Sequence, residues 1–196
     1  DWKVIPQITL NDGFMQRQIE LTKRILDGMD PEAFSIGTLH GVCASAIHPI
    51  EEKYGYEAVR NLQVNHFREN KKPIMEAWKR IADSMARLAQ KYIELGVDGV
   101  YYAGLGGEQR YFTDEEFAEC IEPFDKQILQ AVKSAGGYVF LHICKDGLNM
   151  ERYSSYVKLS DVINWGVYEA PLSLDEGRKL FGDVTIMGGL ANRSGV

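Results

Sequence analysis

The sequence predicts an α/β fold built on a parallel sheet, and two observations carry this prediction. Short apolar segments alternate along the chain with amphipathic helical segments, which is typical of βαβ units. The chain has 196 residues, whereas a closed (β/α)8 barrel usually takes roughly 250. The chain is therefore either part of such a barrel or an open sheet. Its abrupt ends favour a partial barrel.

Five short apolar segments are predicted to be strands, at residues 33–38, 97–103, 138–143, 161–165 and 184–187. A helix over residues 14–26 precedes the first of them. The clearest helix covers residues 74–95, where apolar side chains recur every three or four positions and form one face. Gly96 follows this pattern directly and is a plausible helix stop.

Two further helices are marked by their first residues. Residues 113–116 (TDEE) and 173–176 (SLDE) both have the form of a capping box, in which a hydroxyl and a carboxylate cap the helix reciprocally. Pro123 lies inside the helical stripe that follows the first box, so we expect a kink or a break there. The second helix should stop at Gly182, and residues 148–158 are also predicted to be helical.

Composition narrows the class of protein. The net charge of −6 and the pI of about 5.3 disfavour binding to nucleic acid or to an anionic membrane surface. No apolar run approaches the ~20 residues that span a bilayer, and no signal peptide is visible. Three cysteines, Cys43, Cys120 and Cys144, fit a reducing cytoplasm better than a disulfide scaffold. The chain lacks an initiator Met, and we expect it to be a piece or a trimmed form of something longer.

Functional groups of parallel α/β folds gather where the strands end. The strand that closes with LHIC places His142 and Cys144 two positions apart, hence on one face. Imidazole nitrogen and thiolate sulfur are preferred zinc donors. A catalytic zinc usually takes three protein ligands, and Cys43, Glu169 and a residue beyond Val196 are candidates for the third. On spacing alone, a buried thiol beside a hydrogen-bonded histidine is the competing interpretation.

Other polar residues follow the predicted strands and are candidates for binding a substrate. Glu108 and Arg110 come after the glycine-rich segment 104–107; they are either substrate ligands or a solvated ion pair. The glycine-rich segment lacks both the spacing of a dinucleotide fingerprint and the Lys of a P-loop, so a simple turn is favoured over a phosphate site. Asn164 ends the fourth strand, and Asn192 follows the fifth.

Four segments, taken in order, resemble the uroporphyrinogen decarboxylase superfamily: LGVDGVYYAG, FTDEEFAECIEPFDKQILQAVK, YVFLHICKDG and DVINWGVYEAPLSLDEGRKLFGDVTIMGGLANR. The similarity covers roughly residues 30–196. It implies a (β/α)8 TIM barrel of the uroporphyrinogen decarboxylase type, whose first and last strands lie outside the chain. Residues 1–196 would then be one partial barrel domain. The superfamily includes the decarboxylase itself and zinc-dependent, corrinoid-linked methyltransferases.

The methyltransferase branch carries a His-x-Cys pair as zinc ligands at the end of this same strand, and His142 and Cys144 match it. The resemblance implies that zinc lowers the pKa of a thiol-type acceptor, which then attacks a methyl group on a corrinoid carried by a partner protein. Glu108, Asn164 and Asn192 would shape the pocket. The chain departs from this branch at residues 165–167, where the methyltransferases tend to have an acidic residue.

Two alternatives stay open. The first is cofactor-free decarboxylation of uroporphyrinogen or a related polycarboxylate in tetrapyrrole biosynthesis. Residues 145–147 (KDG) look like the decarboxylase, but Gly104-Leu105 replaces its Asp-Ser, its Tyr is missing from residues 40–46, and only Arg110 and Arg193 supply arginines near the mouth. The second is a non-catalytic barrel that binds a corrinoid protein or another partner. Exposed sheet edges would then be covered by another chain or in a homo-oligomer.

Overall fold

The computed structural model describes residues 1–188 of the chain. One sheet runs in chain order β1-β2-β3-β4-β5, and every neighbouring pair is parallel. The strands are β1 (Ile36–His40), β2 (Gly99–Gly104), β3 (Tyr138–Ile143), β4 (Val162–Trp165) and β5 (Thr185–Met187). Sequential parallel strands joined by helices are part of a (β/α)8 barrel, so the predicted fold class is confirmed.

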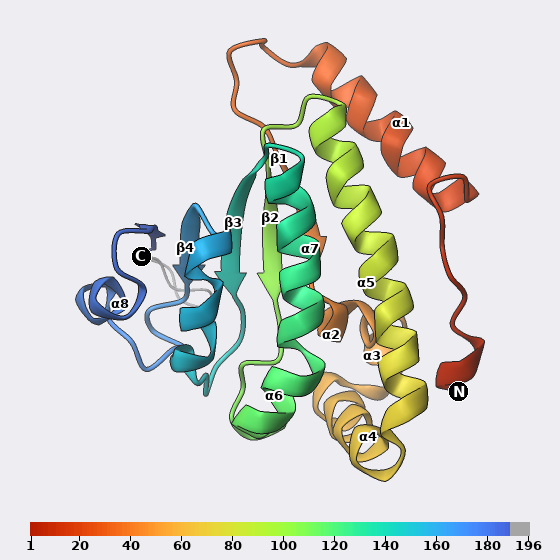
Figure 1. Cartoon of the computed structure of the whole chain (residues 1–196), viewed down its shortest axis with the longest axis vertical. Helices are drawn as coiled ribbons and strands as arrows, with labels where there is room; N and C mark the ends of the chain where they lie inside the picture. Colours follow the sequence, from red (N-terminus) through yellow and green to blue (C-terminus); the bar gives the residue numbers. More distant parts are fainter. Residues whose placement is uncertain (189–196) are drawn as a thin grey trace.

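The connections between the strands are helical (Figure 1). The helices are η1 (Trp2–Val4), α1 (Gly13–Gly28), α2 (Val42–Ser45), α3 (His48–Tyr54), α4 (Tyr56–Glu69), α5 (Lys71–Glu94), α6 (Asp114–Cys120), α7 (Glu122–Ser134), η2 (Met150–Leu159) and α8 (Leu174–Phe181). None of the helices within residues 1–188 is both long enough and apolar enough to cross a membrane.

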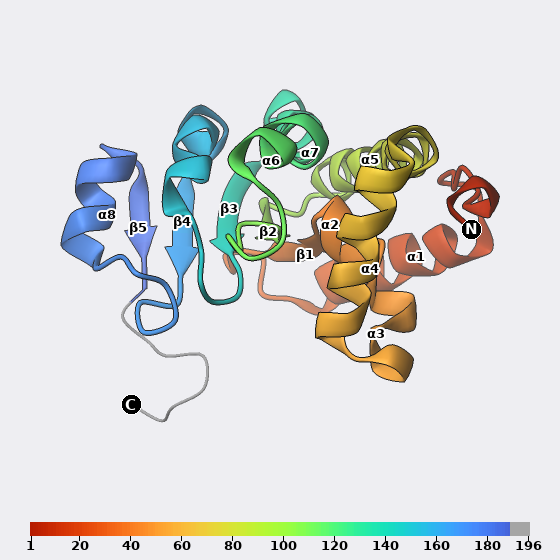
Figure 2. The ribbon, with the colours of Figure 1, turned by 90° about the horizontal axis from the view of Figure 1, so that it is seen from below.

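One face of the sheet is covered by helices and the other is open. Figure 2 shows α5, α7 and α8 ranged along the same side of the strands. The alternation in β3 follows from this arrangement, because Val139 and Leu141 are buried under the helices while Phe140 and His142 are only partly buried. The open face corresponds to the inside of the barrel.

Side chains at the carboxyl ends of the strands form one row across the open face. The strand register places His40, Ala103, His142, Asn164 and Met187 side by side. Paired residues of parallel strands point to the same face, so groups from distant parts of the sequence are brought together here. Helices α2, α3, α4 and α6 lie at this same end of the sheet (Figure 1).

Local sequence signals predicted the helix ends well. Thr113 and Ser173 both form complete capping boxes. The helical segment after Thr113 is interrupted at Ile121, so that Pro123 falls in the first turn of α7. Residues 148–158, predicted to be helical, form the 3-10 helix η2 instead of an α-helix. The buried side chains of η2 are spaced by three residues, which matches the three residues per turn of a 3-10 helix; they are Met150, Tyr153 and Tyr156.

A buried carboxylate lies between the sheet and its helices. Asp125 of α7 is fully buried and accepts hydrogen bonds from the hydroxyls of Tyr102 and Tyr156. Burial raises the pKa of Asp125 to about 7, although the two tyrosine hydrogen bonds oppose the shift. The folded protein therefore holds this proton more tightly than the unfolded chain, in which an aspartate has a pKa of about 3.9.

The stability of the protein should accordingly depend on pH through Asp125. Its folded pKa lies above its unfolded pKa, so this contribution to stability falls as the pH rises from about 4 to about 7. Asp125→Asn keeps an acceptor for the tyrosines and does not titrate. Urea unfolding should show that the free energy of unfolding of Asp125→Asn increases relative to that of wild type as the pH rises through this range. The exposed control Asp27→Asn should show no such increase. A stability difference that does not change with pH would contradict this assignment.

Candidate functional site

His142 and Cys144 lie where β3 ends on the open face. His142 is the second-last residue of β3, and Cys144 follows the strand directly. The backbone N–H of Cys144 donates to the carbonyl oxygen of Gly104 at 3.1 Å. Burial lowers the pKa of His142, so its imidazole is neutral near pH 7. Burial raises the pKa of Cys144, an effect that the neighbouring ammonium of Lys145 opposes.

Asn164 and Tyr101 surround the imidazole of His142. Nδ1 of His142 lies 2.6 Å from Oδ1 of Asn164, which also accepts a hydrogen bond from the hydroxyl of Tyr101 at 2.9 Å. The Tyr101 ring stacks on the imidazole, with 5.4 Å between the ring centroids and 21° between the planes. Asn164 is therefore in direct contact with His142, the candidate zinc ligand.

The described residues do not complete a set of three metal ligands. No three His, Cys, Asp or Glu side chains within residues 1–188 lie close enough together to hold a metal ion. Cys43, a predicted candidate, is buried and hydrogen-bonded to Gln63 and Arg60. Glu169, another predicted candidate, follows β4 and forms no group of three potential ligands with His142 and Cys144. Neither residue is the third ligand in this structure. The third candidate lies beyond Val196.

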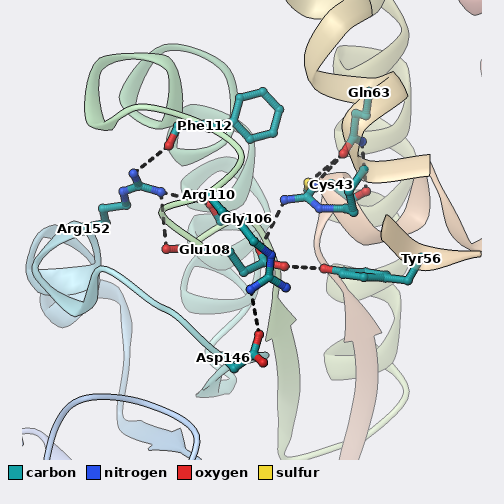
Figure 3. Close-up of polar contacts among 11 residues, drawn as sticks. Cys43, Tyr56, Gln63, Gly106, Glu108, Arg110, Phe112, Asp146 and Arg152 are labelled. Carbon is teal, nitrogen blue, oxygen red and sulfur yellow. Dashed lines mark hydrogen bonds and ion pairs between the residues drawn. The ribbon is translucent and has the colours of Figure 1, made fainter. Parts of the chain in front are cut away.

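Figure 3 shows a polar network around Glu108 and Cys43. The network lies close enough to Cys144 for the carboxylate of Glu108 to raise the pKa of its thiol. The carboxylate of Glu108 accepts a hydrogen bond from the hydroxyl of Tyr56 and pairs with Arg60, 3.2 Å from Nη2 to Oε2. The side chains of Arg60 and Glu108 are both 0% exposed. Arg60 also donates to Gln63 and Cys43. Both charged groups are thus removed from water, and each compensates the charge of the other.

The backbone at Glu108 joins two loops at the mouth of the sheet. Glu108 and Leu148 form an antiparallel bridge between the loop after β2 and the loop after β3. The N–H of Gln109 donates to the carbonyl of Gly147 at 3.0 Å, and the N–H of Asn149 donates to that of Gly107 at 2.9 Å. The segment that follows Cys144 is therefore held by the loop that carries Glu108.

Two cations lie in this region, of which Arg110 is exposed and Lys145 is half-buried. Arg110 pairs with Asp146 at 3.0 Å, not with Glu108. The ammonium of Lys145 lies 4.1 Å from the centroid of the Tyr56 ring and forms no ion pair with a carboxylate in the described part of the chain. Among residues 1–188, Lys145 is the one non-glycine residue with positive φ, at 86°. Such a backbone conformation is costly for a residue with a side chain and is frequent at functional sites.

The sequence model of the uroporphyrinogen decarboxylase (URO-D) family matches residues 2–194. The chain belongs to the uroporphyrinogen decarboxylase family. A solved structure of a methyltransferase from Methanosarcina mazei is similar, with a TM-score of 0.72 and 14% sequence identity. The match covers 97% of this chain and 53% of that protein, so the chain spans about half of its length. A comparison with curated proteins finds no match.

Within this uroporphyrinogen decarboxylase fold, the structure brings together some of the predicted site residues. His142 and Asn164 contact each other on the open face and Cys144 follows β3 two positions after His142, whereas Glu108 is buried and Arg110 is exposed. Asn192 falls outside the described residues. The roles of these residues in binding a metal or a substrate stay predictions.

Three residues of the site were missed by sequence reasoning, namely Tyr56, Arg60 and Tyr101. Tyr56 and Arg60 belong to α4, which the sequence pattern did not reveal. Tyr101 was inside a correctly predicted strand, and its position two residues before Ala103 would have placed it on the open face.

Proposed function

We propose that this chain is part of a zinc-dependent methyltransferase that moves a methyl group from a corrinoid, carried by a partner protein, to a thiol acceptor. One observation supports this proposal above the others. His142 and Cys144, a nitrogen and a sulfur donor suited to zinc, lie on the open face at the end of β3. The methyltransferase fold of the structural neighbour is compatible with the proposal.

The donor chemistry of the site fits zinc. Burial lowers the pKa of His142 and so favours the neutral imidazole, which is the form that binds a metal. Both His142 and Cys144 are only partly buried, so a metal ion on the open face could reach them. Zinc bound there would supply the Lewis acidity that lowers the pKa of a thiol acceptor. A further protein ligand would come from outside residues 1–188. The role of this chain is to hold one donor in β3 and a second donor just after it, two positions further on, where they are oriented before any ligand arrives.

The reaction that follows is a nucleophilic displacement. The acceptor thiol releases its proton to solvent, and its sulfur forms a bond to the methyl carbon. The carbon–cobalt bond of the corrinoid substrate breaks at the same time, and its electron pair stays on cobalt. The ammonium of Lys145 acts on the Cys144 thiol and favours its thiolate form, which is the form that would bind zinc. Packing of His142 and Tyr101 gives the acceptor site one apolar wall.

The protein at its natural length, loaded with zinc, should transfer the methyl group of free methylcobalamin to small thiols. The absorbance change of the cobalamin and the mass of the methylated thiol would measure the reaction. His142→Ala should abolish transfer, whereas the exposed control His48→Ala should not. The absence of transfer by the zinc-loaded protein, with a panel of small thiols, would contradict the proposal.

A second candidate function has one observation in its favour. The ammonium of Lys145 has no carboxylate partner within residues 1–188, so it is available to an anionic group. This suits decarboxylation of a polycarboxylate such as uroporphyrinogen. Against it, Arg60 and Arg110 are both engaged by carboxylates of the chain. Binding of a polycarboxylate to the metal-free protein would be the test if methyl transfer fails.

A further inference from the structure

Asn164 is hydrogen-bonded at both ends of its side-chain amide, and this fixes the direction in which the amide points. One end lies 2.7 Å from the carbonyl oxygen of Met187. A carbonyl oxygen only accepts hydrogen bonds, so this end is the amide nitrogen Nδ2. The amide oxygen Oδ1 therefore faces the opposite way, toward Tyr101 and His142.

The contact between Asn164 and His142 decides which imidazole nitrogen carries the hydrogen. Oδ1 of Asn164 lies 2.6 Å from Nδ1 of His142. An amide oxygen has no hydrogen to donate, so Nδ1 must be the donor. A neutral imidazole carries a hydrogen on one nitrogen only. Nε2 is consequently the nitrogen with a free lone pair.

Tyr101 holds the same amide and the same ring. Its hydroxyl donates to Oδ1 of Asn164 at 2.9 Å, and its ring stacks on the imidazole of His142. The two donors occupy both lone pairs of Oδ1. Because the three residues come from the adjacent strands β2, β3 and β4, the sheet and not a loop sets this geometry.

We infer that Asn164, held by Tyr101 and by the carbonyl of Met187, is a positioning residue that keeps His142 in the Nδ1–H tautomer with Nε2 free to bind a ligand. The consequence for zinc rests on the proposed function, since Nε2 is then the metal-binding atom. The tautomer itself does not depend on zinc. Partners of this kind contribute about 10–100-fold to metal affinity in known sites.

The direct test is the tautomer of His142 in the metal-free protein at its natural length. Long-range ¹H–¹⁵N NMR of labelled imidazole, at a pH where the ring is neutral, distinguishes the two nitrogens, and His142→Gln assigns the signals. Wild type should show a protonated Nδ1 and an unprotonated Nε2. Asn164→Leu, which removes the acceptor, should shift the population toward Nε2–H. Asn164→Asp, which keeps an acceptor, should not.

The wild-type spectrum alone can overturn the inference. A protonated Nε2 in wild type would do so even if Asn164→Leu does not fold. An unchanged tautomer in folded Asn164→Leu would do so as well. The signals of exposed His48 serve as the internal reference, because the contacts of this ring are with Glu51 and His40 and should be the same in every variant.

Binding of cobalt(II) to the same proteins separates this inference from the proposed function. Asn164→Leu should bind cobalt(II) about 10–100-fold more weakly than wild type, and Asn164→Asp should stay close to wild type. If wild type has the Nδ1–H tautomer but binds no cobalt(II), the proposed function fails and the inference stands. If wild type binds cobalt(II) through His142 with Nε2 protonated in the metal-free state, the inference fails and the proposed function stands.

Discussion

The protein at its natural length should contain about one zinc ion per chain, and either His142→Ala or Cys144→Ser should remove it. Each variant deletes one of the two donors at the end of β3. A site left with one donor from this strand loses the chelation that makes a structural or catalytic zinc tight. Metal analysis of the purified proteins, after reconstitution under reducing conditions, would measure the effect.

Matched controls make this result specific. His48→Ala removes an exposed histidine and Cys120→Ala removes a buried cysteine of α6, and both should keep the zinc. Loss of zinc in all four variants would point to general destabilisation. Wild-type protein that takes up no zinc would show that His142 and Cys144 are pocket residues without a metal.

Arg60→Met should destabilise the fold by about 3–5 kcal/mol, because it leaves the buried carboxylate of Glu108 without its counter-ion. Among residues 1–188, the hydroxyl of Tyr56 would then be the remaining side-chain donor to that carboxylate. A domain of this size has roughly 5–15 kcal/mol of stability in total, so the variant would lose a large part of it. Urea unfolding at fixed pH would give the change in the free energy of unfolding.

The chain supplies both a control and a rescue for this prediction. Arg110→Met breaks the exposed pair with Asp146 and should cost no more than about 1 kcal/mol. The double variant Arg60→Met/Glu108→Met removes both buried charges and should recover much of the lost stability. If Arg60→Met is no less stable than Arg110→Met, then Glu108 does not need Arg60 as its counter-ion, and the prediction is wrong.

The alternation of strands and helices was predictable because the apolar pattern is strong where elements are buried on one side. Helix α4 was not predicted, and the reason lies in its buried face. That face includes Arg60 and Gln63 beside Val59 and Phe67. Hydropathy treats an arginine and a glutamine as exposed, so a helix whose buried side carries a polar network has no clear apolar stripe.

The candidate site was predictable only in part for a similar reason. His142 lies in β3 and Cys144 comes two positions later, just after the strand, so the period of two predicts a common face for them. The pairing of Glu108 with Arg60 joins residues 48 positions apart. Sequence proximity suggested Arg110 as the partner of Glu108 instead. Contacts between distant segments depend on the packing of α4 against the sheet mouth, which no local pattern encodes.

The bridge between Glu108 and Leu148 ties the two loops at the mouth into one cooperative unit. Opening either loop breaks hydrogen bonds that belong to both, so the loops share a single opening equilibrium. A ligand that orders one loop should therefore also favour the ordered state of the other loop. The side chain of Glu108 also pairs with Arg60, so α4 is linked to the same unit through a buried ion pair.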